Sequence, residues 1–483
     1  MVMKNSYLLV IFLLSSSFFL FLVVARKQHD LETKEAVSNH YHNLQTASFI
    51  PSSICTRSTK GDKKRGTTLE VVHKHGPCST FNKDMTKPLS AEEILTLDQD
   101  RVESIRSQLT TNTHNKNDTL GTSKATLPAK SGTTIGSGNY IVKVGLGTPK
   151  KDLSLIFDTG SNLAWTQCRP CSVSCYAQQE PIFEPASSTT YSNISCTAPE
   201  CSALTSATGN QPGCTRSSSR CLYSATYGDN SFSVGYFGKD KLTLTSQDVI
   251  DGFHFGCGQD NEGLFRGAAG LLGLGPDKLS IVSQSADKYG KVFSYCLPSQ
   301  ASYTGSLTFG KNEAAKNIVY TPFSDVKGRS LFGLELEAIF VGGKRLAISP
   351  TVFSSSGTII DSGTVITRLP ATAYAALRQA FRAEMTNYTL TEAFEILDTC
   401  YDFSNAKTIR VPGISMLFGG NTRVDISDQG ILFGDEMSQR CLAFAGNKDD
   451  SNIGIFGNVQ QVTLEVVYDL PGGKVGFGHG ACT

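Results

Sequence analysis

The sequence predicts an all-β fold built as two similar lobes with a cleft between them and only a few short helices. Three observations support this prediction. Short runs rich in Val, Ile, Thr, Tyr and Phe recur along residues 138–483 and are bounded by many of the 45 glycines of the chain. One such segment occurs twice. In this region only residues 371–385, ATAYAALRQAFRAEM, have the pattern of a convincing helix.

Residues 1–25 predict a signal peptide. Lys4 supplies a positive charge, and the apolar run of residues 7–25 ends in Val23-Val24-Ala25, which is small enough for signal peptidase. A signal anchor is the alternative, because the run is long and Arg26-Lys27 follow it. We expect secretion into the extracellular space (the apoplast), with the vacuole or plastid as alternatives. The leader is plainly hydrophobic, whereas plastid leaders are amphipathic and rich in Arg and Ser.

Residues 26–137 predict a pro-segment. Ser90-Ala91-Glu92-Glu93 is a capping box, and apolar residues follow it at helical spacing as far as Leu109, so we expect one amphipathic helix. Residues 110–138 are a polar linker rich in Gly, Ser and Thr. This order indicates a helix that covers part of the protein, followed by a cleavable tether. A disordered linker with one stray helix is the alternative.

Residues 138–483 change to strands and turns. Tyr140–Leu146 alternate apolar and polar residues, as a half-buried strand does. The segments DKLTLTS, GSLTFG and KVGFG are further short strands bounded by glycine or polar residues. We expect an N-terminal lobe over residues 138–325 and a C-terminal lobe over residues 326–483.

The repeated segment supports this division. LSLIFDTGSNLAW (153–165) and SGTIIDSGTVITRL (356–369) both read apolar-apolar-Asp-(Thr/Ser)-Gly-(Ser/Thr). Their aspartates, Asp158 and Asp361, lie 203 positions apart, which is too long for a solenoid repeat and fits two lobes of similar fold. Each lobe then ends a buried strand in an acid, and the two carboxylates are expected to face each other.

Two close carboxylates share one proton, and their titration belongs to the pair. The ionised partner can take a proton from a water held between them, while the protonated partner donates to a carbonyl oxygen. This hydrolyses an amide without a metal or a covalent intermediate. Gly160 and Gly363 let each turn approach closely. Four hydroxyl residues are expected to hold the carboxylates in place: Thr159, Ser161, Ser362 and Thr364.

Asp158-Thr159-Gly160-Ser161 and Asp361-Ser362-Gly363-Thr364 resemble the catalytic motifs of the pepsin-like aspartic proteases. The resemblance covers residues 138–483. It implies a pepsin-like double β-barrel or sandwich and endopeptidase activity at acid pH, with the two aspartates as catalytic residues and no cofactor or metal. Leu271-Leu272-Gly273 and Ile455-Phe456-Gly457 match the apolar segments that the family keeps behind its catalytic loops.

A candidate flap lies at residues 223–237, YSATYGDNSFSVGYF. In the family a hairpin tyrosine closes over the substrate, and Tyr227, followed by Gly228-Asp229 at the turn, matches it. Trp165 stands where the family keeps a tryptophan that hydrogen-bonds the flap tyrosine. Val365-Ile366 stand where relatives often have small or hydroxyl residues, a difference expected to affect substrate preference more than chemistry.

The cysteine-rich stretch of residues 167–201 resembles an insertion of the plant nepenthesin-like group. LEVVHKHGPCS (69–79) resembles the pro-segment of the branch that includes a chloroplast nucleoid DNA-binding protease. These resemblances imply a plant zymogen whose pro-segment is an intramolecular inhibitor, with a Lys or Arg that pairs with the dyad. We expect a monomer with protein or peptide substrates as its partners.

Twelve of the 14 cysteines lie beyond residue 138, and an even number in a secreted chain predicts disulfides. The CxxC at Cys168 and Cys171 would suggest zinc or thiol exchange in a cytosolic chain. The expected disulfide cysteines are Cys168, Cys171, Cys175, Cys196, Cys201, Cys214, Cys221, Cys257, Cys296, Cys400, Cys441 and Cys482. Asn117, Asn193 and Asn387 are in glycosylation sequons, so a glycoprotein is expected.

Charge argues against a nucleic-acid binder. The formal net charge is +1, and residues 138–483 carry 27 basic and 31 acidic residues, whereas a duplex-binding surface is clearly basic. The basic run of residues 57–65 lies in the segment expected to be removed. The sequence therefore predicts an aspartic endopeptidase made as a zymogen. The alternative is a catalytically silent form of the same fold that acts as a binding, inhibitor or DNA-binding protein.

Overall fold

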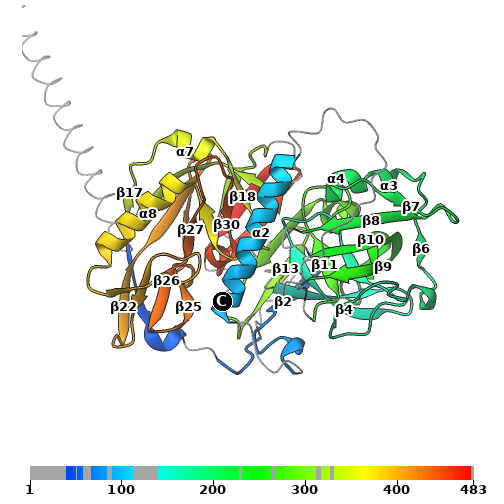
Figure 1. Cartoon of the computed structure of the whole chain (residues 1–483), viewed down its shortest axis with the longest axis horizontal. Helices are drawn as coiled ribbons and strands as arrows, with labels where there is room; N and C mark the ends of the chain where they lie inside the picture. The colour runs from blue at the N-terminus through cyan, green and yellow to red at the C-terminus, as the bar shows by residue number, and fades with distance from the viewer. Residues whose placement is uncertain are drawn as a thin grey trace, which may run out of the picture.

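The structure is a computed structural model, and it describes residues 40–49, 52–57, 67–83, 90–111, 140–227, 231–263, 265, 267–311, 317–326 and 331–479. The predicted signal peptide, Asn117, Gly228, Asp229 and Cys482 lie outside these residues. The predicted all-β, bilobal fold is confirmed: strands dominate, and the two lobes lie side by side, as Figure 1 shows. Within the described residues, no helix has both the length and the apolar composition that a membrane span requires.

One sheet of fifteen strands runs through the molecule. Its order is β14 (Ile318–Pro322), β30 (Lys474–Gly478), β29 (Glu465–Asp469), β12 (Val292–Cys296), β13 (Thr304–Phe309), β2 (Thr67–His73), β3 (Tyr140–Leu146), β4 (Lys151–Asp158), β11 (Gly270–Gly273), β5 (Trp165–Gln167), β10 (Val249–Glu262), β9 (Phe232–Thr243), β8 (Cys221–Thr226) and β7 (Gly213–Cys214), with β6 (Ser192–Asn193) paired to β9. The C-terminal strands β29 and β30 thus return to the sheet that holds the N-terminal lobe.

The C-terminal lobe adds three smaller sheets. They are β15 (Gly333–Leu334), β18 (Thr358–Ile360), β28 (Gly454–Phe456), β19 (Thr367–Leu369) and β27 (Phe444–Gly446); β17 (Lys344–Arg345), β16 (Leu336–Val341), β23 (Ile414–Phe418) and β24 (Thr422–Asp425); and β20 (Thr389–Thr391), β21 (Cys400–Asp402), β26 (Gln439–Leu442) and β25 (Leu432–Glu436). A further pair joins β1 (Tyr41–Gln45) to β22 (Thr408–Pro412).

Helices are few and mostly short. They are α2 (Ala91–Thr111), α3 (Pro199–Ser202), α4 (Leu204–Thr208), α5 (Ile281–Gln284), α6 (Ala286–Tyr289), α7 (Pro350–Ser354) and α8 (Ala371–Glu384), with 3-10 turns η1 (Thr46–Phe49), η2 (Thr80–Lys83), η3 (Pro185–Ser187), η4 (Asp428–Gly430) and η5 (Asn458–Gln461). Helix α8 is the one predicted from residues 371–385, and it buries Tyr374, Leu377 and Phe381 at helical spacing against the C-terminal lobe.

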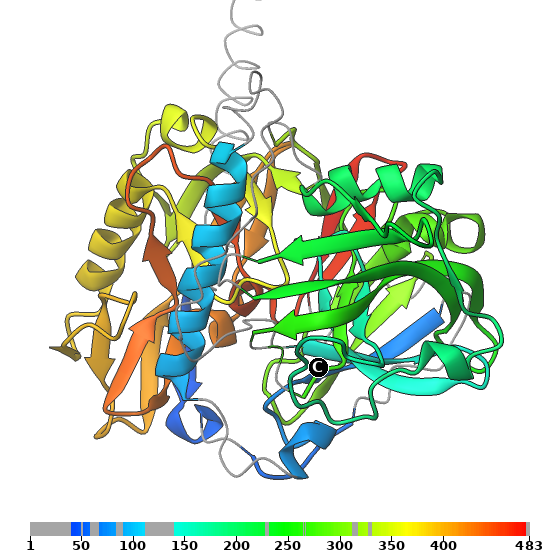
Figure 2. The same cartoon turned by 45° about the vertical axis from the view of Figure 1, so that its right-hand side comes forward.

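The predicted pro-segment contacts the rest of the molecule at several places, among them two strands and one helix. Strand β1 pairs with β22, β2 lies between β13 and β3, and α2 lies across the junction of the two lobes, as Figures 1 and 2 both show. The predicted capping box is present: Ser90 N–H donates to Glu93 over 2.8 Å, and Glu93 N–H donates to Ser90 over 3.2 Å. This part of the chain is therefore built into the fold.

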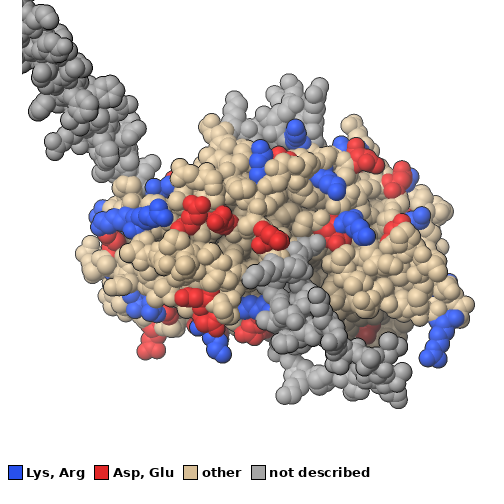
Figure 3. Space-filling model, turned by 90° about the horizontal axis from the view of Figure 1, so that it is seen from above, with Lys and Arg blue, Asp and Glu red and all other residues tan. Residues whose placement is uncertain are grey.

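The surface charge is mixed where Figure 3 displays it. On that face, viewed from above, basic and acidic side chains are interspersed. The pattern agrees with the nearly balanced composition of residues 138–483.

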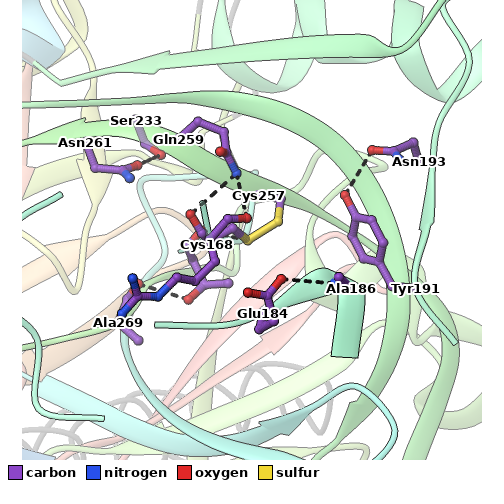
Figure 4. Close-up of a disulfide and its surroundings, with 12 residues drawn as sticks. Cys168, Glu184, Ala186, Tyr191, Asn193, Ser233, Cys257, Gln259, Asn261 and Ala269 are labelled. Atoms are coloured by element: carbon purple, nitrogen blue, oxygen red, sulfur yellow. Dashed lines mark hydrogen bonds between the residues drawn. A yellow bond between two sulfur atoms is a disulfide. The ribbon is translucent and has the colours of Figure 1, made fainter. Parts of the chain in front are cut away.

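Disulfides tie the insertion and the strands together, as expected. The pairs beyond residue 138 are Cys168–Cys257, Cys171–Cys175, Cys196–Cys214, Cys201–Cys221 and Cys400–Cys441, and Cys296 is also disulfide-bonded. Figure 4 shows the bond between Cys168 and Cys257, where Gln259 donates to the carbonyl oxygen of Cys168 over 3.4 Å. A further pair, Cys55–Cys78, lies in the predicted pro-segment and was not among the expected disulfides.

Candidate active site

Two strand ends bring the repeated motifs together at the junction of the lobes. Asp158 is the last residue of β4, which runs parallel to β11, with Gly273 beside Asp158. Asp361 follows β18, which runs parallel to β28. Both carboxylates are fully buried. The apolar segments that the family resemblance placed behind the catalytic loops are therefore the strands that support both aspartates.

The Asp158 carboxylate is held by its own loop. The N–H of Gly160 donates to its Oδ1 over 3.0 Å, and the hydroxyl of Ser161 donates to its Oδ2. A carboxylate that accepts several hydrogen bonds is stabilised in its charged form and fixed in orientation.

The Asp361 loop repeats this arrangement. The N–H of Gly363 donates to Oδ1 over 2.9 Å, and the hydroxyl of Thr364 donates to Oδ2 over 2.6 Å. Glycine is required in both loops because a Cβ at Gly363 would lie 2.6 Å from Oδ1 of Asp158, and one at Gly160 would lie 2.8 Å from Oδ1 of Asp361. Each carboxylate therefore faces the loop of the other.

The two loops are also bonded to each other. The N–H of Ser362 donates to Oγ1 of Thr159 over 2.9 Å, and the N–H of Thr159 donates to Oγ of Ser362 over 3.1 Å. All four groups are buried. Each hydroxyl thus satisfies a backbone donor of the opposite lobe, and the relative position of the carboxylates is fixed by protein groups alone.

Arg101, from α2, reaches both aspartates. Its Nη2 donates to Oδ1 of Asp158 over 2.8 Å and to Oδ1 and Oδ2 of Asp361 over 3.0 and 2.9 Å. Its Nε donates to Oδ2 of Asp361 over 3.0 Å. Charge-assisted pairs of this geometry are among the strongest polar contacts in proteins. One nitrogen atom therefore lies within hydrogen-bond distance of both carboxylates.

The electrostatics of the two acids differ. Burial raises the pKa of Asp158, and the charge of Asp361 raises it further, although Arg101 opposes both effects. Burial also acts to raise the pKa of Asp361, but Arg101 and the bonds from Thr364 and Gly363 outweigh it and hold that pKa below its ordinary value. The two carboxyl groups are therefore unequal while Arg101 is bound, although their titration belongs to the pair.

The candidate flap has the expected contact at its base. Tyr227 directly follows β8, and Nε1 of Trp165 donates to its hydroxyl over 2.8 Å. Trp165 is buried and packs edge-on against Phe265 at 4.7 Å between ring centroids. The tyrosine ring is thereby held in place from below.

Comparison with known proteins decides the family. Residues 140–311 and 332–479 match the family models described as xylanase inhibitor N-terminal and xylanase inhibitor C-terminal. Aspartyl protease AED1 of Arabidopsis thaliana is 49% identical over 444 residues, which cover 91% of this chain and 92% of that protein. Aspartic proteinase nepenthesin-2 of Nepenthes gracilis is 38% identical over 354 residues, 71% of this chain and 77% of that protein. The chain belongs to the pepsin-like plant aspartic protease family.

The fold of this aspartic protease family member is shared with a solved globulin structure. Basic 7S globulin from soybean aligns with a TM-score of 0.58 and 19% identity over 70% of this chain and 92% of that chain. At this identity the likeness describes the architecture only.

Three polar residues near the dyad were not singled out from the sequence. They are Arg101 and Asp98 on α2, and Arg368 on β19, which pairs with Asp98 at 3.0 Å. A signal was present, because Leu95, Asp98 and Val102 share one face of the helix at spacings of three and four residues. A charged residue inside an apolar stripe indicates a specific partner.

Proposed function

We propose that the chain is an aspartic endopeptidase that is made as a zymogen and works at acid pH. The observation that carries this proposal is the pair of buried aspartates, which symmetric hydrogen bonds hold face to face. Among the described part of residues 138–483, no other ionisable group is hydrogen-bonded to either carboxylate. Both acids and all four supporting hydroxyls of the family motif are in place.

The proposed reaction uses a water molecule between the carboxylates. The Nη2 atom of Arg101 marks a position within hydrogen-bond distance of both, and a water takes this position when Arg101 leaves. The ionised carboxylate of the pair removes a proton from the water as the water attacks the peptide carbonyl carbon. The protonated carboxyl group of the pair gives its proton to the carbonyl oxygen. The resulting gem-diol then returns a hydroxyl proton to that carboxylate as it collapses, and the amine leaves with the proton that was taken from the water.

The inhibitory role of the pro-segment follows from the same contacts. With Arg101 on the dyad, the position for water is occupied, and α2 lies across the junction where a substrate must bind. Removal of α2 frees the dyad. The cleavage that releases α2 is expected in the linker that follows this helix.

We also propose that the protein is secreted. Asn193 and Asn387 are exposed, so both sequons are accessible to glycosylation in the secretory pathway. A decrease in mass on treatment of the plant-expressed protein with an N-glycosidase tests it, and an Asn193→Gln, Asn387→Gln double variant controls for the sites.

Proteolysis of a denatured protein by the acid-treated full-length chain, followed between about pH 2 and about pH 8, tests the enzyme proposal. Wild type is expected to cut on the acid side, and Asp158→Asn, matured at an engineered site, is expected not to cut. The full chain is used because β2 contributes to the central sheet.

A second candidate is a binding or inhibitory role, because the matched family models carry the description xylanase inhibitor. A folded, matured wild type that cuts nothing, but that binds and inhibits a xylanase, would establish this candidate instead.

A further inference from the structure

Helix α2 presents an acid as well as a base to the body of the protein. Asp98 lies one turn before Arg101, and its side chain is fully buried. We propose that Asp98 occupies a carboxylate-binding subsite formed by Arg368 and the backbone N–H groups of Val365 and Ile366, and that the matured enzyme selects substrates with Asp or Glu at this subsite. The inference rests on the proposed endopeptidase function and names its substrate class.

The contacts of Asp98 are those of a complete carboxylate site. The N–H of Val365 donates to Oδ1 over 2.5 Å, and the N–H of Ile366 donates to Oδ2 over 2.9 Å. The guanidinium of Arg368 lies 3.0 Å from Oδ2, and the exposed fraction of its side chain is 1%. Two backbone donors and one buried guanidinium therefore converge on a single carboxylate.

The site adjoins the catalytic loop. Val365 directly follows Thr364, whose hydroxyl bonds Asp361. Asp98 and Arg101 are three positions apart on a helix, so their backbones are separated by about 4.5 Å along its axis. A side chain that enters this subsite thus belongs to a residue near the peptide bond to be cut.

Loss of the pro-segment leaves the site without its acid. Of the other described partners of Arg368, the Gln99 side chain at 3.4 Å leaves with α2, and the carbonyl oxygen of Ile366 at 2.9 Å remains. Among the described residues, the ion pairs of Arg368 are limited to Asp98. A substrate that covers this guanidinium and these N–H groups without supplying an acceptor leaves them unpaired, which is unfavourable.

A substrate carboxylate restores these contacts, whereas an amide or apolar side chain leaves the charge of Arg368 unbalanced. Sites built this way discriminate strongly, because the wrong ligand leaves buried polar groups unpaired. The neighbouring position favours an apolar residue, since Leu95 of α2 is fully buried in a cluster that includes Val365 and Leu397.

The test compares cleavage of matched peptides. The full-length protein is matured in acid, and its cleavage of a peptide library shows which position is enriched in Asp or Glu. Two synthetic peptides are then compared that differ only in carrying Glu or Gln at that position. At a pH above the carboxyl pKa of Glu, about 4.3, kcat/KM is expected to favour Glu by about 10-fold or more. An equal rate for both peptides, or no acidic position in the library, would overturn the proposal.

Variants locate the preference. Arg368→Gln is combined with Asp98→Asn, so that the zymogen does not bury an unpaired charge, and the ratio of the two kcat/KM values is expected to fall to about 1. Arg368→Lys keeps the charge and is expected to retain part of the preference. Arg378→Gln, which removes an arginine of α8 whose side chain is 38% exposed, is the matched control and is expected to keep the wild-type ratio. A Glu preference that survives in the double variant contradicts the assignment.

A binding experiment separates this inference from the enzyme proposal. An Asp158→Asn chain is cut at a protease site engineered within residues 112–139, and synthetic peptides of residues 91–106, with Asp98 or with Asn at that position, compete for the released junction. The Asp98 peptide is expected to bind about 10-fold or more tightly. If wild type cuts no peptide yet this difference is found, the enzyme proposal fails and the carboxylate site stands. Equal binding overturns the site itself.

Discussion

Arg101 and Asp361 lie 260 positions apart in the chain and form a two-nitrogen ion pair, with Nε and Nη2 at 3.0 and 2.9 Å from the same carboxylate oxygen. The same Nη2 also reaches Asp158. Because a guanidinium is always charged at working pH, this contact offsets the negative charge of the dyad and fills the position of the water in the proposed reaction.

Removal of Arg101 is expected to activate the uncut chain. Arg101→Met keeps much of the side-chain volume but loses every bond to the dyad, and each charge-assisted bond contributes about 1.5–3 kcal/mol. The pro-segment should then detach at least about 10-fold more readily, and peptidase activity should appear before the chain is cut. Glu103→Met, at an exposed position of the same helix, is the control. An Arg101→Met chain as silent as wild type contradicts the inhibitory role.

Removal of either acid is expected to abolish activity without unfolding the protein. Asp361→Asn removes one carboxylate of the pair that activates water in the proposed reaction, and general acid–base catalysis contributes about 10²- to 10⁴-fold to the rate. The kcat of the matured variant on a peptide is the measurement. Asp152→Asn, on the same strand as Asp158 but with a side chain 50% exposed, should have wild-type kcat.

Ser362→Ala is expected to destabilise the junction of the lobes. The change leaves the buried N–H of Thr159 without its acceptor, which costs about 1–3 kcal/mol in the free energy of unfolding. The midpoint of thermal unfolding should fall by several degrees, as circular dichroism can measure. Ser355→Ala, at an exposed position, should leave the midpoint unchanged. Equal midpoints for Ser362→Ala and wild type would show that the cross-loop bond does not hold the lobes together.

Attachment of the pro-segment is expected to weaken as pH falls. Arg101 holds the pKa of Asp361 below its ordinary value of 3.8, so the stabilisation from this pair is present above that value and is lost as protonation proceeds below it. The dissociation rate of a chain cut at an engineered site within residues 112–139, followed by gel filtration, should rise below about pH 4. In Arg101→Met this rise should largely disappear, whereas an unchanged pH profile would place the acid response elsewhere.

Trp165→Phe is expected to reduce substrate turnover modestly. The change removes the donor to the hydroxyl of Tyr227 and retains a ring against Phe265. A neutral hydrogen bond contributes about 0.5–1.5 kcal/mol, so kcat/KM should fall by about 2- to 10-fold, with correct folding shown by an unchanged circular dichroism spectrum. Unaltered kinetics would remove Trp165 from the support of the flap.

Much of the site follows from local sequence signals. An apolar run that ends in Asp-(Thr/Ser)-Gly at Asp158 and again at Asp361 indicates a buried strand that presents an acid, and its repetition indicates a pair. The capping box at Ser90 predicted where α2 begins. The insertion of β2 between β13 and β3 was not predicted, because the alternation of Thr67–His73 indicates a strand but not its neighbours.

The residues of the candidate site were predictable without a structure, since the residue types of the two motifs, their following glycines and their hydroxyls are all local patterns. The identity of the basic residue that meets the dyad, and of the acid that meets Arg368, depends on how distant segments pack together. Arg101 lies 57 positions from Asp158, and Asp98 lies 267 positions from Val365. Helical periodicity shows which face of α2 is buried, but pairing across such separations depends on how the chain packs in three dimensions.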